Sequence, residues 1–342
     1  MIKLNEKMYI NESDFKFSKP AEISFMSVDE SENIDFNEKK IAFLNENVKP
    51  KLDISCKFNE DNCPIENDKD DDYILYALIN LKINKIVVRM KFVSYRGTLT
   101  KICSFPYENR DKTTLSVIKF NGIIFLWWFR SVLTEKNTFY CKSRYAGFRF
   151  EKLMTINSEN DQALPNSKFL SLVSSKIESS KGCHNLVYAG EIDCLRKSNN
   201  KYIELKTRFG KSKDINFSLK KYQFLKWWLQ SYLIGIETVI VGFRNADFII
   251  EDIEEFEVDY FVKAAKGSGY NKNLWTPNVC LNFLGNFLTE IEQFTTDFKD
   301  SDICIVNFNI NNKEVTFTKT NQIDNPNYDF LPTWFRKQYP KA

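Results

Sequence analysis

Hydrophobic residues recur along this chain at two spacings, one typical of β-strands and the other of α-helices. Residues 85–95 (KIVVRMKFVSY) and 116–128 (SVIKFNGIIFLWW) are rich in β-branched and aromatic side chains, which favours strands. Residues 186–195 and 201–208 predict two more strands, joined by a turn at 196–200. Together these segments predict a β-sheet that occupies the middle of the chain.

Helical segments alternate with these strands. The segments that we predict to be helical are 73–81, 166–178, 217–233 and 280–294. Gly235 follows the third of them and suits the position just after a helix end, where glycine readily adopts a positive φ. Residues 237–243 return as a strand, and 303–318 predict a hairpin that turns at Asn311 and Asn312.

The order of these elements indicates the fold class. Strands and helices interleave without a regular βαβ rhythm, which favours an α+β fold with two mixed β-sheets and flanking helices. The hydrophobic content of 43% is enough for one large core, so we expect a single domain over residues 1–342. Residues 59–72 form a polar loop, and we expect residues 1–72 to be an acidic extension that packs on the core.

Membrane insertion and secretion are not indicated. The longest apolar run, 123–129, is far shorter than the roughly 20 residues that span a bilayer, and the first residues are too charged for a signal peptide. The eight cysteines are dispersed and form no CxxC pair, so we expect reduced thiols in an intracellular protein.

Charge is distributed unevenly although the net charge is only +3. Residues 1–75 carry ten Lys and eighteen acidic side chains, whereas residues 196–226 carry ten Lys or Arg against two acidic residues. The basic segment favours contact with a nucleic-acid backbone, with a solvated basic surface as the alternative. His184 is the only histidine and follows Gly-Cys in an expected loop, so catalysis must depend on carboxylates, lysine and metal.

The segment GEIDCLRKSNNKYIELKTR carries the candidate chemistry. Side chains two apart on a strand share a face, so Glu191 pairs with Asp193 and Glu204 pairs with Lys206. If the strands are antiparallel neighbours, the four groups converge, and three carboxylates there require a divalent cation such as magnesium or manganese. An acidic residue followed by Glu-x-Lys is the pattern of PD-(D/E)xK nucleases; the alternative is a surface hairpin with cross-strand ion pairs.

Five motifs in a fixed order resemble the DXO family of decapping exonucleases from about residue 92 onward. The arginine-glycine motif matches Arg96 and Gly97, and the Gly-aromatic-basic-Phe-Glu motif matches residues 147–151 (GFRFE). The Glu-x-Asp and Glu-x-Lys motifs are those of the predicted hairpin. The family's Gln-Ser helix matches WWLQSYLIG, and its following strand matches VGFRN.

The resemblance assigns roles to individual residues. It implies that the metals are bound by Glu151, Asp193, Glu204 and the backbone carbonyl of Leu205. It implies that the RNA 5′ end is contacted by Arg96, Gly97, Glu191, Lys206 and Gln230. Glu191, Asp193, Glu204 and Lys206 are the residues expected to act in catalysis, with two magnesium or manganese ions.

The implied activity is hydrolysis of RNA 5′ ends, with removal of incomplete or unconventional caps (unmethylated cap, NAD cap, 5′ triphosphate) and 5′→3′ degradation. Two alternatives remain: a PD-(D/E)xK-type DNA nuclease, and a catalytically silent RNA-binding partner of a nuclear exonuclease. The nucleus is the expected location, with the cytoplasm as a second one, and a nuclear 5′→3′ exonuclease is a candidate partner.

The chain departs from the family at several positions, which puts substrate preference in doubt more than the hydrolytic core. Arg149 stands where the family usually has Lys, and Leu170, on an expected helix, stands where many relatives have Cys. Trp127 and Trp128 replace more polar residues, and no arginine precedes Arg89.

Overall fold

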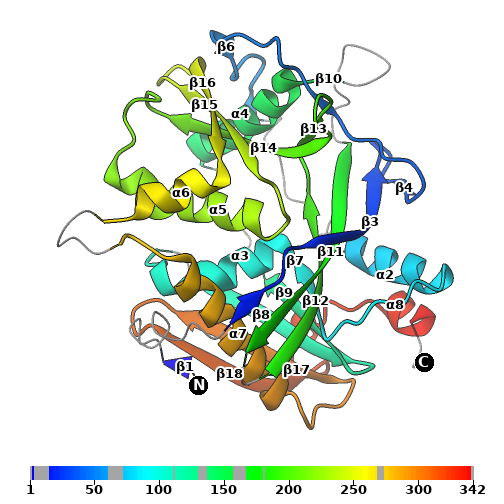
Figure 1. Cartoon of the computed structure of the whole chain (residues 1–342). Helices are drawn as coiled ribbons and strands as arrows, with labels where there is room; N and C mark the ends of the chain where they lie inside the picture. The colour runs from blue at the N-terminus through cyan, green and yellow to red at the C-terminus, as the bar shows by residue number, and fades with distance from the viewer. Residues whose placement is uncertain are drawn as a thin grey trace.

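The computed structural model describes residues 2–3, 15–60, 72–110, 112–129, 137–156, 167–179, 182–267 and 273–339. Its strands form two mixed sheets, one of eleven and one of seven strands (Figure 1). Helices pack between the sheets and on their outer faces, so the predicted α+β class is confirmed. The division into a single domain with an N-terminal extension stays a prediction.

The larger sheet has the strand order β1-β18-β17-β8-β9-β7-β12-β11-β3-β4, and β2 also pairs with β11. Its strands are β1 (Ile2–Lys3), β2 (Lys16–Phe17), β3 (Ala21–Val28), β4 (Ile34–Asp35), β7 (Phe92–Tyr95), β8 (Thr113–Phe120), β9 (Ile123–Phe129), β11 (Lys168–Ser179), β12 (Gly182–Glu191), β17 (Asp302–Asn309) and β18 (Glu314–Asn321). Most neighbours are antiparallel, but β7 runs parallel to both β9 and β12.

The smaller sheet has the order β10-β5-β13-β14-β15-β16-β6. Its strands are β5 (Phe43–Leu44), β6 (Leu52–Asp53), β10 (Thr155–Ile156), β13 (Cys194–Arg196), β14 (Lys201–Phe209), β15 (Thr238–Arg244) and β16 (Ile249–Glu257). The central pair, β14 and β15, is parallel.

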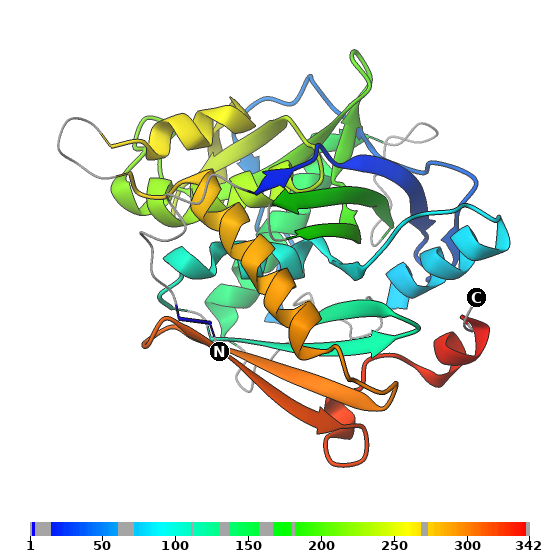
Figure 2. The ribbon, with the colours of Figure 1, turned by 60° about the horizontal axis from the view of Figure 1, so that its bottom comes forward.

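Helices occupy three layers around the two sheets. They are α2 (Tyr73–Ile83), α3 (Arg96–Ser104), α4 (Thr138–Met154), α5 (Phe224–Tyr232), α6 (Val258–Ala265), α7 (Pro277–Phe294) and α8 (Thr333–Gln338). A hydrophobic core of α3, α5, α6 and α7 joins the inner faces of both sheets, and α7 lies across β11 and β12 (Figure 2). Helices α2 and α8 cover the outer face of the larger sheet, and α4 covers the outer face of the smaller one.

The chain passes from the larger to the smaller sheet between β12 and β13. The backbone N–H of Ile192 still donates to Phe169 of β11 at 2.9 Å, whereas that of Leu195 donates to Ala42 beside β5 at 2.9 Å. Ile192 itself is buried. Asp193 therefore lies at the junction of the two sheets.

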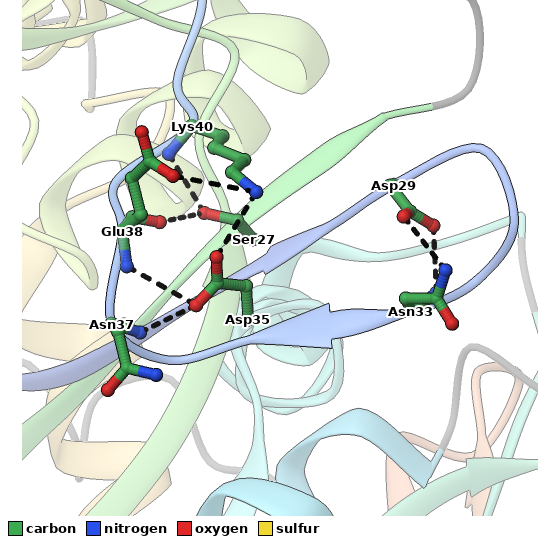
Figure 3. Close-up of polar contacts among 7 residues, drawn as sticks. All are labelled: Ser27, Asp29, Asn33, Asp35, Asn37, Glu38 and Lys40. Atoms are coloured by element: carbon green, nitrogen blue, oxygen red, sulfur yellow. Dashed lines mark hydrogen bonds and ion pairs between the residues drawn. The ribbon is translucent and has the colours of Figure 1, made fainter.

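Acidic side chains of the N-terminal region stabilise tight turns. Asp29 accepts hydrogen bonds from the side chain and the backbone N–H of Asn33, and Asp35 accepts one from the backbone of Asn37 and pairs with Lys40 at 3.2 Å (Figure 3). These bonds lower the pKa of both carboxyls, because they favour the charged form. Part of the negative charge before residue 75 therefore has a structural use.

Several expected elements are confirmed. Helices over 73–81 and 280–294, the strand over 237–243 and the hairpin that turns at Asn311 and Asn312 all occur. The helix over 217–233 is also present, although it begins with a π-helical turn, η4 (Leu219–Gln223). Gly235 has a φ of 80° in the turn that follows α5.

Other expectations are wrong. Strand β11 (Lys168–Ser179) occupies the segment where a helix over 166–178 was expected, so Leu170 is a strand residue. Both faces of β11 are buried, and this leaves no polar alternation. Only the end of 85–95 is a strand, β7, and 116–128 contains two strands around a turn at Asn121 and Gly122, both with positive φ. The segment 186–195 is divided between two sheets.

The cysteine prediction holds in part. Cys56, Cys103, Cys183, Cys194, Cys280 and Cys304 are free. Cys141 is disulfide-bonded, so the expectation of reduced thiols is wrong there; sequence spacing alone does not show which distant cysteines meet. Cys63 lies outside the described residues. Across the part of the chain that is described, no helix is long and apolar enough to span a membrane.

Candidate active site

The β13–β14 hairpin places Asp193 against the middle of β14. The two strands are antiparallel, as the sequence predicts, with Cys194 opposite Ile203. The Asp193 carboxylate accepts a hydrogen bond from the backbone N–H of Leu205 at 2.6 Å. Asp193 therefore lies beside both members of the Glu-x-Lys motif.

Glu204 is the most enclosed charged group of this cluster. Its side chain is 0% exposed, and one carboxylate oxygen accepts a hydrogen bond from the Arg96 guanidinium at 2.9 Å. The other oxygen accepts one from the Lys206 ammonium. The Arg96 side chain is 12% exposed and that of Lys206 is 23% exposed, so both cations are largely shielded from solvent. Glu204 and Lys206 share a face of β14, as predicted.

Glu151 reaches the same cluster from α4. The helix is held against the smaller sheet because Phe150 packs on Gly242 of β15, where a Cβ would lie 2.6 Å from the ring. Two motifs far apart in sequence, GFRFE and VGFRN, thus meet directly. The Glu151 carboxyl is close enough to Asp193 and Lys206 for both charges to change its pKa.

Burial and mutual repulsion govern the electrostatics of the carboxylates. Burial, followed by the charge of Glu204, raises the pKa of Asp193 to about 7. Burial and the charge of Asp193 raise the pKa of Glu151 well above its usual range. Burial also opposes ionisation of Glu204, but the attraction of Arg96 and Lys206 outweighs it and lowers the pKa of that group to about 2.

Gly190 permits the approach of Arg96 to Glu204. A Cβ at Gly190 would lie 3.1 Å from both Cβ and Cδ of Arg96, and 2.3 Å from Cδ1 of Ile234. The sequence analysis did not select this residue. Its position directly before Glu191, at the end of a predicted strand, is the signal that could have identified it, because glycine within a strand often marks a close approach.

A cavity of 220 Å³ adjoins the cluster on the side of the larger sheet. Four of the predicted substrate-binding residues line it, namely Arg96, Gly97, Glu191 and Gln230. The other lining residues are Tyr73, Tyr95, Thr98, Trp127, Trp128, Lys168, Leu170, Ala189 and Gly190. Its walls therefore combine aromatic rings with both signs of charge, and Tyr95, Thr98 and Lys168 are residues that the sequence analysis did not select.

The structure does not place every predicted site residue in that cavity. Glu151, Asp193, Glu204 and Lys206 form the cluster next to it. Glu191 ends β12 and is exposed, so it does not share a continuous strand face with Asp193 as expected; the change of sheet between them breaks the alternation. The Trp227–Trp228 pair is buried in the core between the sheets.

The donor set is suited to a hard divalent cation. Among the described residues, no three His, Cys, Asp or Glu side chains are arranged as a ready metal site, and Arg96 and Lys206 hydrogen-bond to the two oxygens of Glu204. Yet burial of Glu151 and Asp193 side by side leaves negative charge with little compensation, as their raised pKa values indicate. Carboxylate oxygens are the ligands that magnesium and manganese prefer, so these residues fit such an ion.

Two other predicted features lie outside the cluster. His184 belongs to β12 rather than to a loop; it is buried and contacts Thr289 at 2.9 Å and Glu292 at 3.3 Å. The basic segment 196–226 is partly neutralised inside the molecule. Its internal ion pairs are Arg196 with Glu46 and Glu255, Lys201 with Glu237, Lys206 with Glu204 and Lys226 with Glu108. Only part of that charge remains for a ligand.

Asp193 at the junction of two mixed sheets, the Glu204-x-Lys206 strand beside it and the Glu151 carboxyl of a packed helix define a nuclease of the PD-(D/E)XK class. Residues 18–336 match the family model of the RAI1-like PD-(D/E)XK nucleases, and the chain belongs to this family. The resemblance to decapping exonucleases is thereby confirmed.

Individual relatives agree with this assignment. The chain is 27% identical to the "Decapping and exoribonuclease protein" of Xenopus laevis, over 92% of this chain and 85% of that protein. Its fold is similar to that of Scheffersomyces stipitis Rai1, solved with (3'-NADP)+ and a calcium ion (TM-score 0.77, 20% identity, 99% of each chain). It is also similar to Candida albicans Rai1, solved with pU5-Mn2+ (TM-score 0.72, 19% identity, 95% of this chain and 96% of that one).

Proposed function

We propose that this protein is a metal-dependent hydrolase of RNA 5′ ends that removes incomplete or unconventional caps and then degrades RNA in the 5′→3′ direction. The observation that carries the proposal is the position of the acidic cluster. Glu204, bonded to Arg96 and Lys206, lies next to a cavity lined by Arg96 itself, Glu191 and Gln230. A cation-binding centre and a polar pocket therefore share one arginine.

The metal would be held by Glu151, Asp193, Glu204 and the backbone carbonyl of Leu205, with two magnesium or manganese ions as the expected complement. When bound, such ions activate water and stabilise the oxygens of an in-line phosphate displacement. The manganese and calcium ions named with two Rai1 structures support a divalent cation.

The chain's own residues bind and orient the substrate. Arg96 carries a planar guanidinium that can donate two hydrogen bonds to a phosphate, and Glu204 holds it in the lining of the cavity. Lys206 would stabilise negative charge that develops on the phosphate. Glu191 and Gln230 line the same cavity and would position water or the first nucleotide.

The aromatic residues that line the cavity favour a substrate whose 5′ end carries a nucleobase, which can stack on them. Tyr95 and Trp127 pack edge to face with ring centroids 5.0 Å apart, and Trp127 stacks on Phe330 at 4.8 Å, so the aromatic wall is fixed before a ligand binds. An unmethylated guanosine cap, an NAD cap and a 5′ triphosphate are the candidate ends.

We further propose, by analogy with the family, that the protein is located in the nucleus and that it binds a nuclear 5′→3′ exonuclease as a partner.

One panel of substrates tests the activity. Purified protein is incubated with RNAs that bear triphosphate, guanosine cap, methylated cap, NAD, monophosphate or hydroxyl ends, with and without manganese, and with DNA of the same sequence. We expect metal-dependent release of a cap or nucleotide from RNA. Asp193→Asn and Glu204→Gln should abolish it, whereas Lys319→Gln, on the distant strand β18, should not. Cleavage confined to DNA, or unchanged turnover in both site variants, would contradict the proposal.

A further inference from the structure

A second cavity, larger than the one beside Arg96, lies on the smaller sheet. Its volume is 480 Å³, against 220 Å³ for the cavity beside Arg96, and the two share no lining residue. Cavities that bind small molecules measure roughly 300 to 1,000 Å³. The second cavity is therefore of a size that holds a small molecule, and the mechanism proposed above does not use it.

Strand register shows which face of the smaller sheet carries this cavity. Ile240 of β15 lines it and is opposite Leu205 of β14, so both side chains leave the face of the sheet that α4 covers. Glu204 adjoins Leu205 in sequence, and its side chain leaves the opposite face. The sheet itself therefore separates the second cavity from the Arg96–Glu204 pair.

Apolar side chains make up much of the lining of the second cavity. They are Leu44, Val48, Met154, Ile240 and Ile253. Leu44, Met154 and Ile240 are only 7%, 4% and 5% exposed and belong to the hydrophobic core beneath α4. The cavity thus reaches down to this core, and an apolar ligand that covered these side chains would gain hydrophobic free energy.

The charged residues of the lining leave one negative charge uncompensated. Glu255 binds the Arg196 guanidinium through both carboxylate oxygens, at 2.9 and 2.6 Å, and Oε1 of Glu46 lies 3.1 Å from Nε of the same group. Among the described residues, no other charged side chain lines the cavity, and Glu46 makes no other polar contact. The remaining lining residues are neutral and polar, namely Asn45, Ser198 and Asn199.

Both carboxylates can be reached from solvent. The side chains of Glu46 and Glu255 are 55% and 45% exposed, whereas that of Arg196 is 15% exposed and already paired. A ligand that enters the cavity therefore meets two carboxylates before it meets the guanidinium. Such a lining favours one positive charge over a neutral group and disfavours an anion.

We propose that this cavity is a second ligand-binding site, specific for a small organic monocation that joins an amine to an apolar body. The apolar body lies against Ile240 and Ile253, and the ammonium group donates hydrogen bonds to Glu46 and Glu255. This inference does not depend on the proposed function, because it concerns binding at the other face of the smaller sheet.

The test uses three probes that share a phenyl ring and differ in charge: phenethylamine, phenethyl alcohol and hydrocinnamate. Each is titrated into the full chain at neutral pH, and Kd is measured by calorimetry. We expect the amine to bind about tenfold more tightly than the alcohol, since its hydrogen bonds are made to charged groups, and the carboxylate to bind most weakly.

Variants locate the site. Glu46→Gln removes the uncompensated charge but leaves the Arg196–Glu255 pair, so it should weaken binding of the amine about tenfold and leave that of the alcohol unchanged. Ile253→Ala should weaken both probes to a similar extent. Glu290→Gln, at an exposed position of α7, is the control that should change neither. Thermal unfolding checks that each variant folds, and Glu46→Gln decides the matter if Ile253→Ala does not.

The outcomes keep this inference apart from the proposed function. Equal affinity for the amine and the alcohol, or tighter binding of the carboxylate, would overturn the preference for a cation. Undetectable binding of the amine, or an unchanged Kd in Glu46→Gln, would overturn the site itself. The wild type is also assayed with RNA, and a protein that binds the amine but hydrolyses no RNA would contradict the proposed function alone.

Discussion

Arg96 and Glu204, 108 positions apart in sequence, are joined by a hydrogen-bonded ion pair of 2.9 Å that links the two sheets. Arg96 begins α3 directly after β7 of the larger sheet, and Glu204 lies on β14 of the smaller one. The pair therefore positions the cavity and the acidic cluster relative to one another. Its removal should affect both the stability and the activity of the protein.

Arg96→Ala should destabilise the metal-free protein by about 3 kcal/mol, because it leaves the buried Glu204 carboxylate with Lys206 as its remaining cation. Arg96→Lys should cost less, since it keeps the charge but loses the planar fork. Lys19→Ala removes an exposed pair with Glu237, side chains 78% and 47% exposed, and should change stability by at most about 0.5 kcal/mol. Urea unfolding in EDTA measures the free energy of unfolding of the three variants. Equal losses in Arg96→Ala and Lys19→Ala would contradict the role of the Arg96–Glu204 pair in stability.

Stability of the metal-free protein should depend on pH through Asp193. The folded-state pKa of about 7 is above the usual value of 3.8, so the native state binds more protons than the unfolded state between these limits. The free energy of unfolding must then fall as pH rises through this window. Glu204 acts in the opposite sense, but its pKa of about 2 confines that effect to pH below about 4.5.

Asp193→Asn removes this titration and keeps the local structure, because the amide oxygen can still accept the hydrogen bond from Leu205. It also removes the charge that raises the pKa of Glu151, and this acts on stability in the same direction. Relative to wild type, the variant should gain stability on the order of 2 kcal/mol as pH rises from about 5 to about 8 in EDTA, while activity is lost. The comparison cancels the contribution of His184, whose pKa is lowered by burial in both proteins. Parallel stability curves would show that Asp193 is not strained in the native state.

Addition of manganese should raise the melting temperature of the wild type, because the ion relieves repulsion among Glu151, Asp193 and Glu204. At about 100 times Kd, linkage gives about 2.7 kcal/mol, or about 4 °C for a chain of this size. Glu151→Gln should remove most of this increase. Lys319→Gln is the control that should retain it, and an undiminished increase in Glu151→Gln would exclude Glu151 as a ligand.

Sequence analysis could predict the hairpin and the motifs because their information is local. Antiparallel pairing of β13 with β14 follows from two short strands around a turn, and it brings Asp193 to Leu205 directly. The prediction of a helix over residues 166–178 was wrong because burial on both faces depends on the rest of the fold and is not a local property. A strand buried on both faces, as β11 is, has no polar alternation, so its apolar spacing is indistinguishable from that of a helix.

Contacts between distant segments could not be predicted from spacing. Nothing local shows that Arg96 reaches Glu204, that Phe150 packs on Gly242, or that the chain changes sheets between Glu191 and Asp193. The order of motifs suggested that these residues belong together, but only the packing of α3 and α4 shows how. Gly190 was overlooked because the need for a missing side chain appears only when Arg96 is in place.

Gly190→Ala tests that requirement. The added methyl would lie 2.3 Å from Cδ1 of Ile234 and 3.1 Å from Arg96, so it should destabilise the protein by about 1 to 3 kcal/mol and lower kcat/KM by displacing Arg96. Gly147→Ala on α4 is the matched control, since no atom lies within 4 Å of its added methyl, and it should be neutral or stabilising by up to about 1 kcal/mol.

Ile234→Val separates the two contacts. It removes the Cδ1 atom that is closest to the new methyl but leaves the contact with Arg96. In the Gly190→Ala background it should therefore restore part of the stability, measured by urea unfolding, while kcat/KM stays low. If it restored both, the approach of Arg96 to Glu204 would not depend on Gly190, and the loss of activity would be a consequence of misfolding alone.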